Sequence, residues 1–319
     1  MERSHAAYNR LVESARSKHV DAPLAAVVHP CSQSSIEAVA EASEQGLIRP
    51  ILVGPPERIA AAAKEAEVDL SGLPVISVPH SHAAAAEAVA LVNRGGAALL
   101  MKGSLHTDEL MKAVLPSVGG LRTERRVSHC YLMDVEGYPA PLIITDAAIN
   151  IAPGLLEKAD IVRNAIDLAH VIGIALPRVA ILAAVETVNP AMQSTLDAAA
   201  LCKMADRGQI TGGLLDGPLA FDNAVSVTAA EDKGIVSPVA GTAQILVVPN
   251  LEAGNMLAKQ LTFLGNADAA GIVLGARVPI ILPSRADSVR TRLASCAVAV
   301  LLARAAEGPL PRAVPVADA

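Results

Sequence analysis

Several polar and charged residues follow short apolar runs in this sequence, at positions where they could act on a ligand. Lys102 and Ser104 follow one such run, and the carboxylates Asp146 and Asp216 follow two others. In an open α/β sheet, ligands bind beyond the carboxyl ends of the strands. A lysine there can hold an anion, whereas a carboxylate can bind a metal, act as a base or cap the next turn. The residues alone leave these alternatives open.

A second candidate for chemistry is the segment 280–288, which ends an apolar run and leads into a predicted helix over 286–303. Helix N-termini carry unpaired N–H groups and a partial positive charge, and Arg285 adds a planar fork that matches phosphate oxygens. The segment therefore predicts an anion site at Ser284 and Arg285. The alternative is that Ser284 or Asp287 caps the helix while Arg285 pairs with a surface acid.

Standard signatures of other enzyme classes are missing from the sequence. There is no G-x-x-x-x-G-K-[ST] loop, no G-x-G-x-x-G after a first strand, no G-x-S-x-G and no H-E-x-x-H. The four cysteines lie far apart and form no C-x-x-C pair, which favours reduced thiols over a disulfide framework or a zinc site. We therefore expect no metal held by these thiols.

Composition excludes some classes of partner. The 319 residues have a formal charge of −6, with three Tyr, two Phe and no Trp, so the basic face and aromatic platforms that bind nucleic acid are absent. The longest apolar runs are far shorter than the 18 residues that cross a bilayer, and the first twenty residues have no apolar signal region. We expect a cytoplasmic protein that binds neither nucleic acid nor membrane.

The elements that must position these residues alternate between apolar runs and alanine-rich helical stretches, which predicts an α/β fold with helices on both faces of a mostly parallel sheet. A capping box at Ser34 and Glu37 is expected to start one helix over 34–44. The runs at 127–133 and 142–144 are separated only by a turn, so they predict an antiparallel hairpin where the domain changes. The expected strands are 24–28, 48–53, 75–78, 98–101, 127–133, 142–144, 179–182, 213–215, 245–248, 271–274 and 280–282.

Six segments between Leu100 and Arg304 carry a family resemblance when they are taken together and in order. They are 101–107 (MKGSLHT), 126–128 (RVS), 144–150 (ITDAAIN), 216–222 (DGPLAFD), 249–255 (PNLEAGN) and 284–285 (SR). The set resembles the phosphate acetyltransferase and phosphate butyryltransferase family. The strings 102–106 and 284–288 look closest to the butyryltransferase-like branch.

The resemblance implies reversible acyl transfer between coenzyme A and inorganic phosphate, by direct exchange in a ternary complex. It implies a homodimer in which coenzyme A is a substrate and no cofactor or metal is permanently bound. The implied fold has two three-layer α/β/α domains with a cleft between them, as in isocitrate and isopropylmalate dehydrogenases. We expect one domain over 1–143 with 285–319 and the other over 144–284.

Site residues also follow from the resemblance. In the family the Ser-Arg pair lies in the cleft and the arginine holds the phosphoryl group, which carries over to Ser284 and Arg285. Acetyltransferase members usually place the general-base carboxylate seven residues after the serine, where this chain has Thr291, so Asp287 is the substitute. The expected substrate-binding residues are Lys102, Ser104, Arg126, Ser128, Asp146, Asp216, Asp222 and Asn255.

Two other classes of function remain compatible with the sequence. A metal-dependent decarboxylating dehydrogenase on the same fold would need a carboxylate triad, which Asp146 and Asp216 could begin. A non-catalytic acyl-CoA-sensing domain could keep the fold and lose the arginine, so an intact Ser284-Arg285 pair favours catalysis. Phosphate-dependent release of coenzyme A would distinguish the acyltransferase from these two classes.

Overall fold

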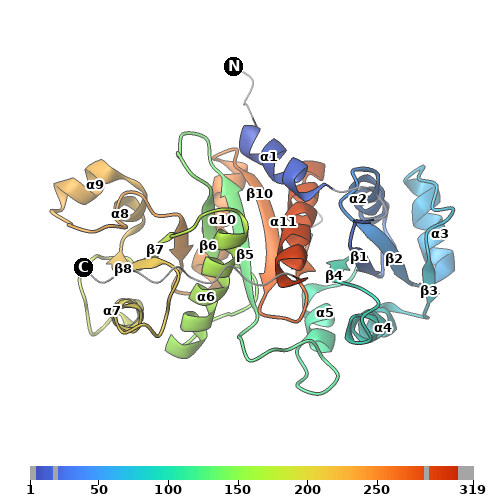
Figure 1. The fold of residues 1–319 in the computed structure, drawn as a ribbon, viewed down its shortest axis with the longest axis horizontal. Helices are drawn as coiled ribbons and strands as arrows, with labels where there is room; N and C mark the ends of the chain where they lie inside the picture. Colours follow the sequence, from blue (N-terminus) through green and yellow to red (C-terminus); the bar gives the residue numbers. More distant parts are fainter. Residues whose placement is uncertain (1–4, 17–20, 284–286, 308–319) are drawn as a thin grey trace.

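One eleven-stranded sheet runs along the whole molecule (Figure 1). The computed structural model describes residues 5–16, 21–283 and 287–307. The strands are β1 (Leu24–Val28), β2 (Arg49–Gly54), β3 (Val75–Ser77), β4 (Leu99–Lys102), β5 (Ser128–Asp134), β6 (Leu142–Thr145), β7 (Arg178–Leu182), β8 (Leu214–Leu219), β9 (Ile245–Val247), β10 (Asp268–Leu274) and β11 (Ile280–Ile281). Each of the eleven expected strands is confirmed, with small shifts at the ends.

Strand direction changes in the middle of this sheet. The order is β3-β2-β1-β4-β11-β10-β5-β6-β9-β7-β8. Pairing is parallel towards both ends, whereas β11–β10, β10–β5 and β5–β6 are antiparallel. The carboxyl ends of β1, β4 and β11 therefore lie on one edge of the sheet, and those of β6, β9, β7 and β8 lie on the opposite edge. The predicted β5–β6 hairpin is confirmed.

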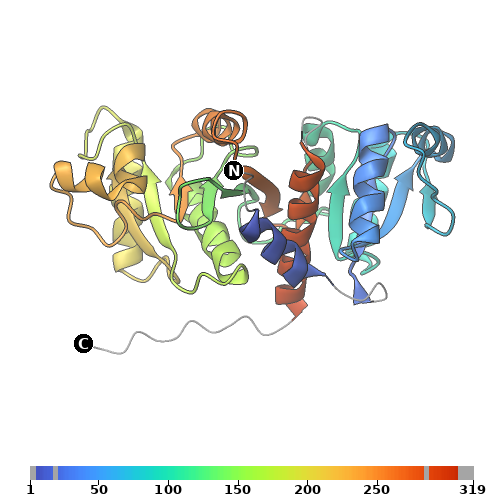
Figure 2. The ribbon, with the colours of Figure 1, turned by 90° about the horizontal axis from the view of Figure 1, so that it is seen from above.

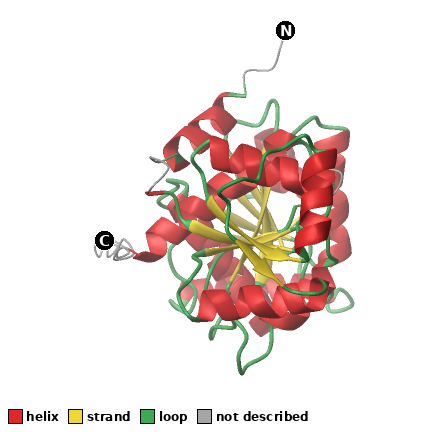
Figure 3. Cartoon of the chain, turned by 90° about the vertical axis from the view of Figure 1, so that its right-hand side faces the viewer, coloured by secondary structure: helices red, strands yellow, loops and turns green. Residues whose placement is uncertain are grey.

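Helices cover both faces of the sheet, as the sequence predicted (Figures 2 and 3). Residues of α1, α2, α3, α6, α7 and α11 share one buried core with the sheet. On the other face, α4 and α5 cover one half, and α8 and α10 cover the other half. The helices are α1 (Ala6–Ala15), α2 (Gln33–Glu44), α3 (Pro56–Glu65), α4 (Ser81–Asn93), α5 (Thr107–Val114), α6 (Leu155–Val171), α7 (Gln193–Asp206), α8 (Phe221–Val225), α9 (Val227–Asp232), α10 (Leu251–Phe263) and α11 (Val289–Glu307).

Two predicted helix starts are wrong. The start of α2 is capped by Ser32, whose backbone N–H donates to the Ser35 hydroxyl at 3.2 Å, so the predicted box at Ser34 and Glu37 does not form. Helix α11 begins at Val289 rather than at 286, because the Ser288 hydroxyl accepts from the backbone N–H of Thr291 at 3.1 Å. Asp287 thus precedes the helix and does not lie in its first turn.

Strand pairing crosses the expected domain boundaries. The predicted segment 144–284 contains β10 and β11, which pair with β5 and β4 of the predicted segment 1–143 with 285–319. Among the described residues, the strands of both predicted domains belong to one continuous hydrogen-bonded sheet. The division into these two domains stays a prediction.

A buried ion pair joins two helices on the face that α11 also covers. The Lys158 ammonium on α6 lies 2.7 Å from an Asp197 carboxylate oxygen on α7, and the two side chains are 6% and 7% exposed. Gln193 donates to the other oxygen of Asp197 at 2.8 Å. Each buried charge thus has a partner of opposite charge, and the Asp197 carboxylate also accepts a hydrogen bond. Buried charges are tolerated under these conditions.

We predict that Lys158→Met lowers the free energy of unfolding by about 3–5 kcal/mol, because it leaves the Asp197 carboxylate buried without its cation. Urea denaturation measures this loss. Lys203→Met is the control, since the Lys203–Asp206 pair is 66% and 61% exposed, and we expect it to cost less than about 1 kcal/mol. If both variants lose the same small amount, the buried pair does not hold α6 against α7.

Candidate active site

The turn that follows β6 is organised by Asp146. This buried carboxylate accepts from the backbone N–H groups of Ala148 and Ile149 at 2.9 and 3.0 Å, and from both the backbone and the side chain of Asn150. Of the alternatives left open by the sequence, the structure shows the turn-capping role. A substrate contact at Asp146 stays a prediction.

Arg126 and Ser128 lie beside this turn. The Arg126 side chain donates to the Asn150 amide oxygen at 2.7 Å and pairs with Glu157 at 2.8 Å. Asn164 donates to the Ser128 hydroxyl at 2.8 Å. The contacts with Asn150 and Glu157 fix the direction of the half-exposed Arg126 guanidinium group, just before β5.

Helix α10 brings Asn255 to the same turn. The Asn255 side chain donates to the carbonyl oxygen of Ala147 at 3.1 Å. A Cβ atom on Gly254 would lie 2.6 Å from the Asp146 carbonyl oxygen, so only glycine lets the helix approach this closely. The structure therefore brings four predicted residues, Arg126, Ser128, Asp146 and Asn255, around one turn.

Lys102 and Ser104 lie in a different place, at the carboxyl end of β4. They line a small pocket together with Ser32, Ser34, Ser35, Gly103, Pro283 and Arg292, which we call the serine pocket. The Ser104 hydroxyl donates to the Ser32 hydroxyl at 2.8 Å. The Lys102 ammonium donates to the carbonyl oxygen of Leu105 at 3.2 Å.

Asp287 opens on a larger cavity of about 890 Å³, which we call the α10–α11 cavity. Its lining includes Thr291 at the start of α11, Lys259 on α10 and Tyr131 on β5. Burial raises the pKa of Tyr131, and the negative charge of Asp287 adds to that rise. The volume falls in the range of ligand-binding clefts. Ser284 and Arg285 lie outside the described residues.

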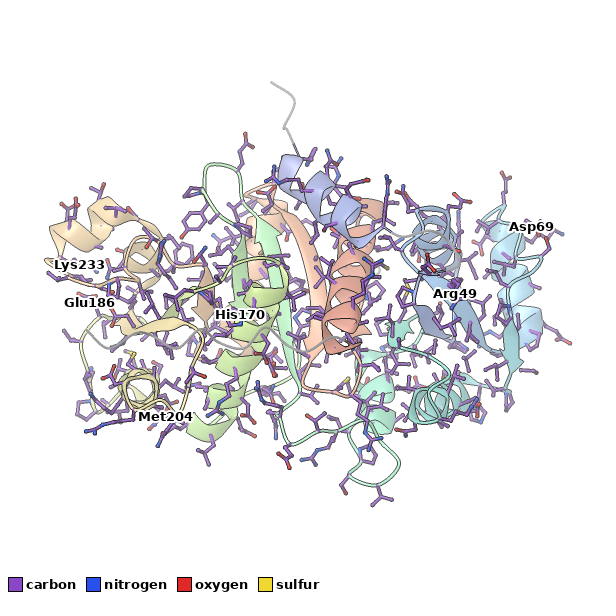
Figure 4. All side chains as sticks on the ribbon, in the orientation of Figure 1. Arg49, Asp69, His170, Glu186, Met204 and Lys233 are labelled. Carbon is purple, nitrogen blue, oxygen red and sulfur yellow. The ribbon has the colours of Figure 1, made fainter. Side chains whose placement is uncertain are left out.

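Asp216 and Asp222 lie neither at the turn after β6 nor in the serine pocket. Asp216 lies on the edge strand β8, three strands from β6, and its carboxylate accepts from the backbone N–H of Gly217 at 2.8 Å. Asp222 is exposed on α8, 3.8 Å from the Lys233 ammonium. Glu186 also pairs with Lys233, and both side chains lie at the end of the molecule formed by β8, α8 and α9 (Figure 4).

Six of the candidate residues thus form two groups on opposite edges of the sheet, while Asp287 lines the α10–α11 cavity. Lys102 and Ser128 are separated by three strand spacings and by three residues of rise, which corresponds to roughly 17 Å. A compact ligand cannot touch both groups at once. An elongated ligand can span that distance.

Some residues of these sites were not predicted. Ser32 and Ser35 follow β1 within the string CSQSS, so a serine cluster after an apolar run was an available signal. Arg292 and Asn164 lie inside helices, where no local pattern marks them. Their roles arise from packing between distant elements.

His129 is a further residue that the sequence did not indicate. It is 2% exposed on β5, its Nδ1 has no hydrogen-bond partner among the described residues, and its ring meets that of Tyr131 at 4.5 Å between centroids. Burial lowers the pKa of His129 to about 4, and the negative charge of Asp146 opposes the shift. The imidazole is therefore neutral at pH 7.

Comparison with known proteins agrees with this architecture. The model of a family described as phosphate acetyl/butaryl transferase matches residues 80–300. A protein named phosphate acetyltransferase from Rhizobium meliloti is 64% identical over 93% of both chains. A phosphate butyryltransferase from Clostridium beijerinckii is 43% identical over 90% of this chain and 95% of its own. The chain belongs to this phosphate acetyl/butyryl transferase family, as its motifs predicted.

Solved structures carry the same fold. A branched-chain phosphotransacylase from Enterococcus faecalis V583 superposes with a TM-score of 0.77 at 29% identity, over 88% of this chain and 99% of its own. A phosphotransacetylase from Streptococcus pyogenes gives 0.79 at 22% identity, over 96% and 100%. A 4-hydroxythreonine-4-phosphate dehydrogenase from Burkholderia phymatum gives 0.52 at 15% identity, over 88% and 98%. The predicted dehydrogenase-like α/β fold is confirmed.

Across residues 5–16, 21–283 and 287–307, no three His, Cys, Asp or Glu side chains gather as a metal site would require. Within those ranges no helix is both long and apolar enough to span a bilayer.

We predict that His129 makes stability depend on pH. Because its pKa is about 4 in the folded chain and about 6.5 when unfolded, the unfolded state binds more protons between these values. The stabilising contribution is complete above pH 6.5 and is lost as the pH falls towards 4. Between pH 7 and pH 5 the loss should be about 2 kcal/mol, measured by urea denaturation.

His129→Gln should remove this part of the pH dependence, whereas His106→Gln, at an exposed position, should keep the full slope. A slope that is unchanged in His129→Gln would show that other groups carry the pH dependence.

Proposed function

We propose that the chain catalyses reversible acyl transfer between coenzyme A and inorganic phosphate, giving acyl phosphate and free coenzyme A from acyl-CoA and phosphate. The observation that carries this proposal is 64% identity to a protein named phosphate acetyltransferase across 93% of both chains. The α10–α11 cavity, which Asp287 lines, is of a size that suits a ligand. Acetyl-CoA is the first substrate to test and butyryl-CoA the alternative, since a relative at 43% identity carries the butyryl name.

The reaction needs a base, an oxyanion site and a group that takes the charge of phosphate. In the direction of acyl-CoA synthesis, the thiol sulfur attacks the acyl carbonyl carbon, the base takes the thiol proton, and the bond from that carbon to the phosphate oxygen breaks. The thiol has a pKa of about 8.5, so it is mostly protonated at neutral pH and a base is useful.

We assign these tasks to the segment 284–287. Ser284 donates a hydrogen bond to the oxyanion, Arg285 takes the charge of the leaving phosphate, and Asp287 is the general base. Asp287 lies ahead of the capping residue Ser288, so it does not occupy the first-turn position where the helix dipole would most lower its basicity. It lines the same cavity as Thr291, the position at which the family usually has its carboxylate.

The other predicted residues serve as substrate contacts in this proposal. Lys102 and Ser104 act at one edge of the sheet, and Arg126, Ser128, Asp146 and Asn255 act at the other, which suits an elongated coenzyme A. Asp216 and Asp222 lie farther away and remain candidates only for a more remote contact. The exchange is direct, in a ternary complex, within a cytoplasmic homodimer that holds no permanent cofactor.

The experiment measures thiol release from acetyl-, propionyl- and butyryl-CoA with and without phosphate. We expect phosphate-dependent release without added metal or nicotinamide, with the fastest substrate defining the acyl preference. Activity that a chelator abolishes and Mg²⁺ restores, or hydride transfer to a nicotinamide alone, would replace this proposal with the dehydrogenase. Binding of acyl-CoA with no turnover would indicate the sensing domain.

We predict that Asp287→Asn lowers turnover by at least about tenfold and alters the acidic limb of the pH–rate profile, because that limb reports protonation of the base. The sharper test is the pair Asp287→Asn with Thr291→Asp, which returns a carboxylate to the same cavity. Recovery of activity in the double variant supports the assignment. If Asp287→Asn changes thermal stability alone and leaves the pH profile intact, the base is another group.

A further inference from the structure

The start of α11 is bound to two other elements through the side chain of Arg290. The Arg290 guanidinium lies 3.5 Å from a carboxylate oxygen of Asp268, the first residue of β10. It also lies 2.8 Å from Nδ1 of His5, just ahead of α1, and 5.6 Å from the ring centre of Tyr8 on α1. We call His5, Tyr8, Asp268 and Arg290 the Arg290 cluster.

Asp268 closes this cluster from the side of the sheet. Its carboxylate is 16% exposed, with one oxygen 2.5 Å from Nδ1 of His5 and the other facing Arg290. An isolated exposed ion pair contributes little to stability, whereas several charges in a partly buried network contribute more. A cation over an aromatic ring adds a further attraction. The cluster therefore ties the start of α11 to both β10 and α1.

Helix α1 is also attached to the far end of α11. The Arg304 guanidinium donates to the carbonyl oxygens of Ser14 and Ala15 at 3.3 and 2.8 Å. These carbonyl groups belong to the last turn of α1, where a helix leaves its C=O groups without intrahelical partners. Helix α1 thus lies beside α11 and is held at both ends (Figure 1).

The Arg290 cluster forms part of the wall of the α10–α11 cavity. Tyr8, Asp268 and Arg290 line this cavity, as Asp287 does. Tyr8 and Asp268 also line a second cavity of about 560 Å³, beside α1 and the end of α6. The motifs that carry the family resemblance begin at residue 101, so they do not indicate this contribution of α1.

Hydrogen bonds in the first turn of α11 connect Arg290 to the segment that carries Asp287. The Ser288 hydroxyl accepts from the backbone N–H of Thr291 at 3.1 Å, and the Ser288 carbonyl oxygen accepts from that of Arg292 at 3.1 Å. A shift of Arg290 therefore moves Ser288, the direct neighbour of Asp287. A general base must lie within hydrogen-bond reach of its proton, and a displacement of about 1 Å can cost about a hundredfold in rate.

We propose that Arg290 is a positioning residue, held by Asp268, His5 and Tyr8 so that Asp287 faces the α10–α11 cavity at the distance that proton transfer needs. Helix α1 thereby takes part in assembling the site, although it carries none of its motifs. The proposal rests on the proposed function, in which Asp287 takes the proton of the coenzyme A thiol.

The test measures acyl-transfer kinetics in Arg290→Met, Arg290→Lys and Asp268→Asn. We expect Arg290→Met and Asp268→Asn to lower turnover at least about tenfold and to change the KM values for acyl-CoA and phosphate less than about threefold. Arg290→Lys should restore most of the turnover, because it keeps the charge beside Asp268. Arg94→Met is the matched control, since the Arg94–Glu87 pair lies on the surface of α4, and we expect no change.

A double variant separates a positioning role from a general loss of structure. If Arg290 acts through Asp287, then Arg290→Met should cost less than about twofold in a chain that already carries Asp287→Asn. A loss of the same factor in both backgrounds overturns the proposal. A raised KM for either substrate with unchanged turnover also overturns it, because Arg290 would then contact substrate directly.

Hydrogen exchange of the backbone amides of 287–292 supplies a readout that needs no turnover. We expect exchange at least about threefold faster in Arg290→Met than in Arg94→Met, because the first turn of α11 opens more often. Circular dichroism must show that Arg290→Met is folded, and Asp268→Asn provides the same comparison if it is not.

Failure of this proposal differs from failure of the proposed function. If the wild-type chain transfers acyl groups while folded Arg290→Met and Asp268→Asn keep normal turnover and exchange, the function stands and the positioning role falls. If the wild-type chain releases no thiol but exchange rises in both variants, Arg290 still positions the segment and the proposed function falls.

Discussion

The reversal of strand direction in the middle of the sheet is the constraint on which the rest of the molecule depends. Three antiparallel pairs, β11–β10, β10–β5 and β5–β6, separate two parallel halves. Because parallel strands present their carboxyl ends on one edge, the two halves present theirs on opposite edges. Polar loops that look equivalent along the sequence are therefore divided between two places about 17 Å apart, by strand geometry.

Buried polar groups hold each of these places in position. Asp146 uses its carboxylate to close the turn that then carries Asn150, and Asn150 directs Arg126. At the other edge, Ser32 caps α2 and accepts from Ser104. In a region with little water, each unmade hydrogen bond would cost free energy, so the networks specify one arrangement of loops.

Much of the fold could be predicted from the sequence, because strands buried on both faces read as continuous apolar runs. The eleven runs and the 127–145 hairpin needed only that local signal. The starts of helices were predicted less accurately. Ser34 and Ser288 each lie close to other hydroxyl residues, and the local sequence does not decide which of these residues caps the helix. The motifs identified Arg126 and Asp146 as site residues. Their link through Asn150, like the places of Arg292 and His129, depends on contacts between elements far apart in sequence.

The first turn of α11 separates the serine pocket from the α10–α11 cavity. Arg292 lines the first, while its neighbours Thr291 and Leu293 line the second. Ligands in the two places would therefore contact adjacent residues of one helical turn. If binding of one ligand shifts the position of this turn, it changes the affinity for the other ligand. Thermodynamic linkage makes that change in affinity the same in both directions. If both places bind ligands, this single helical turn is the part of the chain through which their binding would be coupled.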